Sequence, residues 1–145
     1  MPAHSPSDAP PPLILIVDDV EDTRLMYESF LTYRGFRAAT AGSGKKVLEL
    51  ALDERPDLIV MDYSMPDVDG LTAARQLAAE PITADVPFIL ITGHLELVTP
   101  SMAKAAGARS LILKPCLPDV LEAEVRRVLG GDREFRIVRG TPRDL

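Results

Sequence analysis

The sequence predicts an α/β protein with an open, doubly wound sheet of parallel strands, and two observations carry this prediction. Five short apolar runs alternate with five longer stretches in which apolar side chains recur at helical spacing. The runs are almost uniformly apolar, which is typical of strands that are buried on both faces of a parallel sheet. Right-handed crossovers between such strands place helices on both faces.

The predicted elements are bounded by residues that favour turns. Glycine or proline lies at one end of each expected helix, where a helix commonly starts or stops, and Ser43 is expected to cap the second helix. The expected strands are LILIV, FRAAT, DLIVM, VPFILIT and SLIL, at 13–17, 36–40, 57–61, 86–92 and 110–113. The expected helices cover 20–34, 44–55, 71–79, 95–106 and 118–129.

One domain is expected over residues 13–129, because a chain of 145 residues suffices for a single core. Residues 1–12 contain five prolines and no apolar periodicity, so we expect a disordered, proline-rich tail there. Residues 130–145 are too short for an effector domain and are expected to form a frayed C-terminal tail. The FRIV segment at 135–138 is nevertheless suited to pairing with a sheet edge or a partner.

Composition argues against several classes of function. The net charge of −6 and the lack of helix-turn-helix or zinc-finger spacing argue against nucleic acid as a partner. No apolar run approaches the roughly 20 residues of a membrane helix, and residues 1–12 lack the features of a secretory signal. We therefore expect a cytoplasmic protein without membrane contact, and the single cysteine, Cys116, excludes an internal disulfide.

Polar residues of complementary charge follow four of the five predicted strands. Asp18 and Asp19 follow the first strand, Asp62 the third, Thr92 closes the fourth, and Lys114 follows the fifth. Ligands of open α/β sheets bind beyond the carboxyl ends of the strands, which lie along one edge. The sequence therefore predicts a site containing three carboxylates, one hydroxyl and one ammonium group.

This set of side chains favours a divalent cation and phosphoryl chemistry. Three neighbouring carboxylates repel one another unless a proton or a cation neutralises them. Mg²⁺ suits the site, because it uses one or two protein carboxylates, keeps several waters and leaves room for a phosphate oxygen. A carboxylate beside such an ion can attack phosphorus, while Lys114 and Thr92 can bind the oxygens of the transferred group.

The motifs that contain these residues resemble the receiver domain of bacterial response regulators. The resemblance covers about residues 13–129 and rests on IVDD at 16–19, MDYSMPDVDG at 61–70, ITGH at 91–94 and LKP at 113–115. It implies a flavodoxin-like sheet of five strands in the order 2-1-3-4-5, with five helices. The chain is thus identified as a receiver that stands almost alone.

The resemblance assigns a role to each residue of the predicted site. Asp62 would accept the phosphoryl group, and it would bind Mg²⁺ together with Asp19 and the backbone carbonyl of Ser64. Asp18 would act mostly through water bound to the metal, while Lys114 and Thr92 would stabilise the phosphoryl group. Gly70 is expected to need a backbone angle that other residues resist, and the Lys114–Pro115 peptide bond is expected to be cis.

Two positions concern regulation. Leu111 occupies the switch position, where the family usually has Tyr or Phe, so the usual aromatic switch is in doubt. His94 lies two residues after Thr92, where the resemblance places a side chain near the attacking water. His94 is either a modulator of the phosphorylated state or an exposed bystander.

The function that the resemblance implies is that of a signalling switch. The domain would take a phosphoryl group from a phosphohistidine of a sensor histidine kinase or histidine phosphotransfer protein, and then change a binding surface for a downstream protein. It would not be an enzyme beyond catalysing its own phosphorylation and dephosphorylation. A homodimer stays open, and the alternative function is a receiver-shaped interaction module that works without phosphorylation.

Four other sites fit the sequence poorly. The AGSGKK segment at 41–46 lacks the first glycine and the Ser or Thr of a Walker loop. Acidic residues after the first strand would repel the phosphate of a flavin, and Val20 breaks the D-x-D motif of haloacid-dehalogenase phosphatases. His4, His94 and Cys116 lack the spacing of a zinc site.

Overall fold

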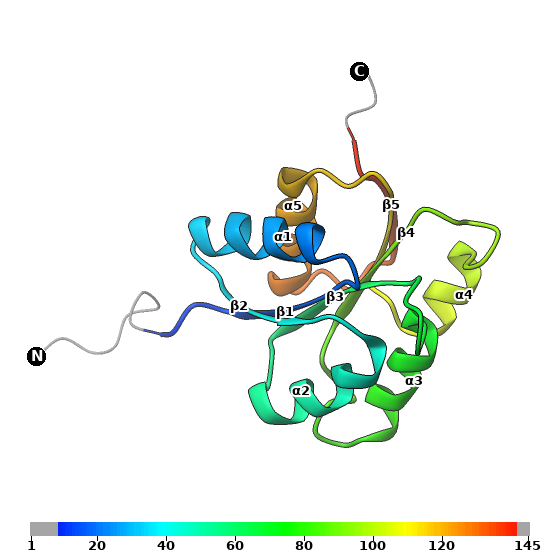
Figure 1. Cartoon of the computed structure of the whole chain (residues 1–145), viewed down its shortest axis with the longest axis horizontal. Coiled ribbons are helices and arrows are strands. Elements are labelled where there is room, and N and C mark those ends of the chain that lie inside the picture. Colours follow the sequence, from blue (N-terminus) through cyan, green and yellow to red (C-terminus); the bar gives the residue numbers. More distant parts are fainter. Residues whose placement is uncertain (1–8, 142–145) are drawn as a thin grey trace, which may run out of the picture.

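The structure, a computed structural model, describes residues 9–141 and consists of one parallel sheet between two layers of helices (Figure 1). Within these residues, no helix is long and apolar enough to cross a membrane. The elements in chain order are β1 (Leu13–Val17), α1 (Glu21–Tyr33), β2 (Arg37–Ala41), the 3-10 turn η2 (Gly44–Lys46), α2 (Val47–Glu54), β3 (Leu58–Asp62), α3 (Gly70–Ala79), β4 (Phe88–Thr92), α4 (Pro100–Ala105), β5 (Ser110–Leu113), α5 (Pro118–Leu129) and β6 (Arg136–Arg139).

The six strands are all parallel and lie in the order β2-β1-β3-β4-β5-β6. The first five confirm the predicted order 2-1-3-4-5. The prediction of five strands is wrong by one, because β6 pairs with β5 inside the expected C-terminal tail. Gly131 makes this return possible, since its φ of 100° lies in the left-handed region and turns the chain back after α5.

The two helical layers explain why the central strands are almost entirely apolar. Helices α1 and α5 cover one face of the sheet, and α2, α3 and α4 cover the other (Figure 1). Along β1, Leu15 and Val17 pack with the second layer, whereas Ile14 and Ile16 pack with the first. A strand that lies between two layers buries every side chain, as all five residues of β1 do.

Helix α4 is shorter than its apolar pattern predicted. The sequence indicated a helix over 95–106, but α4 begins at Pro100 because Thr99 caps it, accepting a hydrogen bond from the Met102 amide at 3.2 Å. The preceding residues form a turn in which the Leu97 amide donates to the His94 carbonyl at 2.9 Å. An irregular segment therefore joins the site residue Thr92 to α4.

The glycine-rich segment before α2 also differs from the prediction. Ser43 makes no side-chain capping bond there. Instead the carboxylate of Asp67 accepts hydrogen bonds from the amides of Gly44 and Lys45, at 3.1 and 3.0 Å. These backbone donors are therefore bound to a carboxylate of the β3–α3 loop.

Candidate functional site

The predicted site residues meet at the carboxyl edge of the sheet. Strands β1 and β3 are neighbours, as are β3 and β4, and β4 and β5. Asp18 and Asp19 directly follow β1, Asp62 ends β3, Thr92 ends β4, and Lys114 directly follows β5. The strand order thus brings together residues that are as many as 96 positions apart in the chain, from Asp18 to Lys114.

Three carboxylates form a candidate metal site. Each of Asp18, Asp19 and Asp62 offers an oxygen that lies within 4.8 Å of the other two. Asp18 and Asp62 are 4% and 3% exposed, whereas Asp19 is open to solvent. Burial, together with the negative charge of Asp62, raises the pKa of Asp18. A hard cation would relieve this repulsion, so the donor set fits Mg²⁺.

Lys114 neutralises part of the charge of the cluster. Its Nζ donates to Asp62 Oδ2 at 2.5 Å, across the neighbouring strand β4. Burial alone would lower the pKa of Lys114, but the hydrogen bond and the charge of Asp62 outweigh it and raise that pKa. The ammonium group therefore stays protonated beside the carboxylate that is expected to react.

Thr92 and Ser64 are tied to the site through the backbone. The buried Thr92 hydroxyl oxygen accepts a hydrogen bond from the His94 amide at 2.9 Å, and the Lys114 amide donates to the Thr92 carbonyl at 2.8 Å. The Ser64 amide donates to Asp62 Oδ1 at 3.0 Å. Each carboxylate oxygen of Asp62 thus accepts at least one hydrogen bond, which orients the group.

The side chain of His94 lies on the exposed side of the β4–α4 loop. Its Nδ1 is 3.1 Å from Glu96 Oε1, and the two side chains are 57% and 71% exposed. A hydrogen bond from its own backbone, together with this bond to His94, lowers the pKa of Glu96. His94 is therefore near Thr92 in the chain, while its ring contacts another residue of the same loop.

Leu111 lies deep in the core. It is fully buried in the α2–α3–α4 layer, between Leu90 of β4 and Ile137 of β6 in the sheet. An aliphatic side chain in this place has no polar atom with which to follow a movement of Thr92. The loss of the usual aromatic switch at this position stays a prediction.

Gly70 is needed for a reason other than the predicted one. Its φ is outside the left-handed region, but a Cβ there would lie 2.9 Å from Leu90 Cδ2 and 3.1 Å from the Asp62 carbonyl oxygen. The start of α3 therefore lies so close to β3 and β4 that a larger residue would require these neighbours to shift. The expected cis peptide between Lys114 and Pro115 is present.

Three residues that support the site were not predicted from the sequence. Arg24 of α1 donates from Nη1 to the Asp18 carbonyl at 2.7 Å, and the buried Tyr27 hydroxyl donates to the Cys116 carbonyl at 2.8 Å. Both fix loops that carry site residues. Asp67 holds the glycine-rich turn, as described above. Arg24 could have been noticed in the sequence, because it is the single basic residue in the first turns of the predicted α1. The contacts of Tyr27 and Asp67 depend on tertiary structure.

The comparisons with known proteins agree with this geometry. The sequence matches the response regulator receiver domain over residues 14–126. The chain belongs to this family. It is therefore a receiver domain of the two-component type.

Several relatives are longer than this chain. It is 36% identical over 124 residues to the transcriptional regulatory protein AfsQ1 of Streptomyces coelicolor, which covers 85% of this chain and 54% of that protein. It is 34% identical over 116 residues to the regulatory protein AtoC of Escherichia coli, which covers 80% of this chain and 25% of that protein. The chain spans about half the length of AfsQ1 and a quarter of AtoC.

Solved receivers match nearly over their whole length. The chemotaxis response regulator CheY4 of Vibrio cholerae has a TM-score of 0.75 at 28% identity, with 81% of this chain and 98% of that chain covered. The receiver domain of the sensor histidine kinase PA1611 from Pseudomonas aeruginosa has a TM-score of 0.75 at 26% identity, with 83% and 99% covered. The latter structure has a magnesium ion coordinated in the active site cleft.

Proposed function

We propose that this receiver takes a phosphoryl group from a phosphohistidine of a partner protein onto Asp62, with Mg²⁺, and thereby changes a protein-binding surface. One observation carries the proposal. The carboxylate of Asp62 lies at an open strand end, between the ammonium group of Lys114 and the carboxylates of Asp18 and Asp19. This arrangement supplies a nucleophile together with charges of both signs that can hold a cation and a phosphoryl group.

The transfer balances without further reactants. An oxygen of the Asp62 carboxylate forms a bond to phosphorus, the bond from phosphorus to the histidine nitrogen breaks, and its electron pair stays on the imidazole. Lys114, which already contacts Asp62, neutralises charge on the transferred group, and the hydroxyl of Thr92 can rotate to donate to one of its oxygens. Hydrolysis by water returns the carboxylate.

The residues that would hold the metal are Asp19, Asp62 and the carbonyl of Ser64, with Asp18 acting through bound water. Mg²⁺ would supply positive charge that brings the phosphoryl oxygens and the carboxylate together. The magnesium ion of the PA1611 receiver supports this assignment by analogy. The exposure of Asp19 beside two buried carboxylates leaves one side of the site open to the ion and its waters.

Apolar side chains around the site suit a docking partner. Val20 and Leu117 follow β1 and β5 at the same edge of the sheet, and they are 50% and 38% exposed. Leu25 and Met26 add exposed apolar surface on α1. We assign this surface to the histidine-containing partner, either a sensor kinase or a histidine phosphotransfer protein in the cytoplasm, because it would place the phosphohistidine over Asp62.

The experiment is phosphorylation by a small donor such as acetyl phosphate, read by intact mass. The parent protein should gain one phosphoryl group when Mg²⁺ is present and none after chelation. Asp62→Asn should gain none, because the amide is a poor nucleophile. Asp53→Asn, which changes an exposed aspartate of α2, is the matched control and should be labelled like the parent.

The result also separates this proposal from the alternative of an interaction module that works without phosphorylation. Equal labelling of Asp62→Asn and of the parent would remove Asp62 as the acceptor. A parent that stays unlabelled, by the small donor and by a phosphorylated histidine phosphotransfer protein alike, would favour the interaction module. In the proposed function the domain is a switch whose chemistry is confined to its own aspartate.

A further inference from the structure

Strand β6 lies outside the part of the chain that matches the receiver family. The match ends at residue 126, and β6 begins at Arg136. β6 pairs with β5 on one side and forms the edge of the sheet on the other, among the residues that the structure describes. The surface at this end of the sheet is therefore made by residues beyond the family match.

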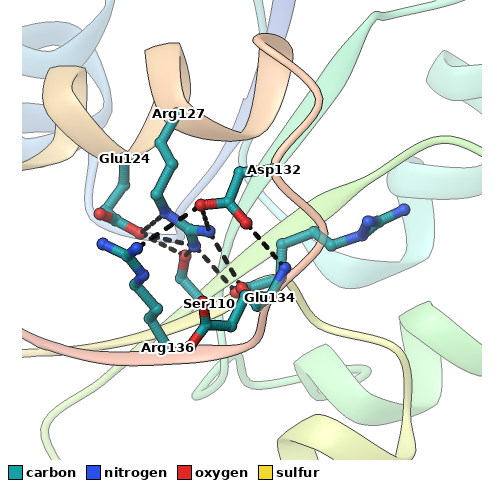
Figure 2. A network of polar contacts seen from close by, with 7 residues as sticks. Ser110, Glu124, Arg127, Asp132, Glu134 and Arg136 are labelled. Atoms are coloured by element: carbon teal, nitrogen blue, oxygen red, sulfur yellow. Dashed lines mark hydrogen bonds and ion pairs between the residues drawn. The ribbon is translucent and has the colours of Figure 1, made fainter.

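A polar network fixes β6 to the body of the protein (Figure 2). The side chain of Arg127 from α5 is only 11% exposed and pairs with Glu124 and Asp132. Its guanidinium group also donates to the carbonyl oxygens of Arg109 and Glu134, at 3.1 and 2.9 Å. One buried arginine thus connects α5, the start of β5 and the segment that leads into β6.

The far end of β6 is fixed as well. The Gly140 amide donates to the Leu113 carbonyl at 3.0 Å, and the Gly140 carbonyl accepts from the Leu117 amide at 2.8 Å. A Cβ at Gly140 would overlap the carbonyl oxygens of Leu113 and Pro115, so only glycine fits there. Anchored at both ends, β6 presents an ordered strand edge.

The backbone bonds show which groups this edge presents. The amides of Arg136 and Gly140 donate to carbonyls at the two ends of β5, at 3.2 and 3.0 Å. Because successive residues of a strand point their backbone groups to opposite sides, residue 138 also faces β5. The N–H and C=O groups of Ile137 and Arg139 therefore point away from the sheet, and an edge of this kind is a template for another strand.

The side chains beside these groups are apolar or basic. Ile137 is 54% exposed, although it lies on the same side of the sheet as the half-buried Phe135. Arg136 and Arg139 flank the apolar pair Ile137–Val138. A partner strand that placed a positive charge opposite Arg136 or Arg139 would therefore be repelled.

We propose that β6 pairs antiparallel with β6 of a second copy, which joins two sheets into one across a twofold axis. Only residues whose backbone groups point outward can exchange hydrogen bonds, so Ile137 must face either Ile137 or Arg139 of the second copy. The first register places the two exposed isoleucines against each other and Arg139 against the ring of Phe135, where a guanidinium group packs well. Arg136 then faces Val138, so no arginine lies opposite another.

This surface is self-complementary, as a twofold interface requires. Four residues per strand bury little area, so we expect a dimer that dissociates on dilution. The pairing makes no use of Asp62 and does not depend on the proposed phosphorylation.

Sedimentation velocity over a dilution series tests the proposal. The parent should pass from monomer to dimer as its concentration rises, whereas Ile137→Lys should stay monomeric because it places a charge at the twofold axis. Ile82→Lys is the matched control, since Ile82 is 52% exposed in the turn between α3 and β4, outside β6, and it should dimerise like the parent. A parent that is monomeric throughout, or an Ile137→Lys protein that dimerises as the parent does, would overturn the proposal.

A second variant and a cross-link guard against a folding artefact. Arg139→Pro removes one outward N–H and leaves the bonds from Arg136 and Gly140 to β5, so it should be folded by circular dichroism and monomeric. Ile137→Cys places two thiols at a hydrogen-bonded pair whose Cα atoms lie about 5.5 Å apart, within disulfide range. Oxidised glutathione, which takes up the two electrons, should convert this variant to a covalent dimer and leave Ile82→Cys monomeric. Equal cross-linking of the two variants contradicts the pairing.

Discussion

At the scale of single residues, the site contains both buried and exposed charged groups. Asp18 and Asp62 lie within the protein, and the ammonium group of Lys114 balances part of their charge, while Asp19 faces solvent. A cation that arrives from solvent meets Asp19 first. We therefore expect the exposed carboxylate of Asp19 to contribute to ion binding, while the buried carboxylate of Asp62 is expected to react.

We predict that Mg²⁺ binds weakly at Asp19 and Asp62 before any phosphoryl group arrives, because an open site keeps most of the waters of the ion. Asp19→Ala should abolish this binding, as seen in a titration of backbone NMR shifts. Glu21→Gln removes an exposed carboxylate two residues away and should titrate like the parent. Identical titrations of Asp19→Ala and the parent would show that Asp19 is not a ligand of the ion.

At the scale of elements, Asp67 is predicted to stabilise the glycine-rich turn before α2. Partial desolvation opposes ionisation of Asp67, but hydrogen bonds from the amides of Val68, Lys45 and Gly44 lower its pKa from 3.8 to about 2. A lowered pKa contributes stability that is present above 3.8 and is lost as the pH falls toward 2.

The measurement is thermal unfolding of the parent and Asp67→Asn as a function of pH. The variant should have the lower melting temperature near neutral pH, and the difference should shrink as the pH falls from about 4 to about 2. Asp53→Asn again serves as the exposed control and should follow the parent. A difference that is constant over this range would mean that the charge of Asp67 does not stabilise the turn.

Arg127 is predicted to hold β6 in the sheet. In Arg127→Met the buried Glu124 carboxylate and Ser110 hydroxyl lose a common partner, which should cost about 1–3 kcal/mol of unfolding free energy. Hydrogen exchange should speed up at the amides of Arg136 and Gly140. Arg126→Met changes a neighbouring arginine on the side toward α1, and it should leave those two amides protected. Equal protection in both variants would show that β6 is held by its backbone bonds alone.

The sequence allowed the fold to be predicted where burial determines the pattern. Strands β1, β3, β4 and β5 are almost entirely apolar because helices cover both faces, and the site follows from the polar residue that ends or follows each strand. β6 was not predicted as part of the sheet, because the charged residues Arg136 and Arg139 lie at its two ends. In addition, Arg127, which anchors β6, looks like an exposed helix residue in the sequence.

Local signals also misplaced two helix starts. Thr99 and Pro100 begin α4 five residues later than the apolar spacing indicated, and Asp67 replaces Ser43 as the partner of the turn before α2. In both cases a hydrogen bond to a particular side chain decided the boundary. The bond made by Asp67 joins residues more than twenty positions apart, and such a contact cannot be read from periodicity.

At the scale of the whole molecule, β5 is paired along both of its edges. It lies between β4 and β6, and its middle residue Leu111 is fully buried against Leu90 and Ile137. By contrast, the loop from Gly93 to Thr99 has exposed apolar side chains at Leu95 and Leu97. Thr92 is bonded to both sides, because its hydroxyl oxygen accepts from the His94 amide of the loop and its carbonyl accepts from the Lys114 amide that follows β5.

We predict that phosphorylation moves the β4–α4 loop and the start of α4, while β5 stays nearly still. Moving a two-state surface from 1:99 to 99:1 takes about 5.5 kcal/mol of differential interaction, and Leu111 has no polar group with which to transmit it. A rotation of the Thr92 hydroxyl toward the phosphoryl group breaks its bond from the His94 amide, so the backbone of the loop is the available relay. Hydrogen exchange of the free protein and of its beryllofluoride complex, in which beryllium fluoride stands in for the phosphoryl group on Asp62, can locate the change. Protection should change strongly over residues 93–106 and little over 110–113, whereas changes centred on Leu111 would show that the leucine repacks as an aromatic residue does.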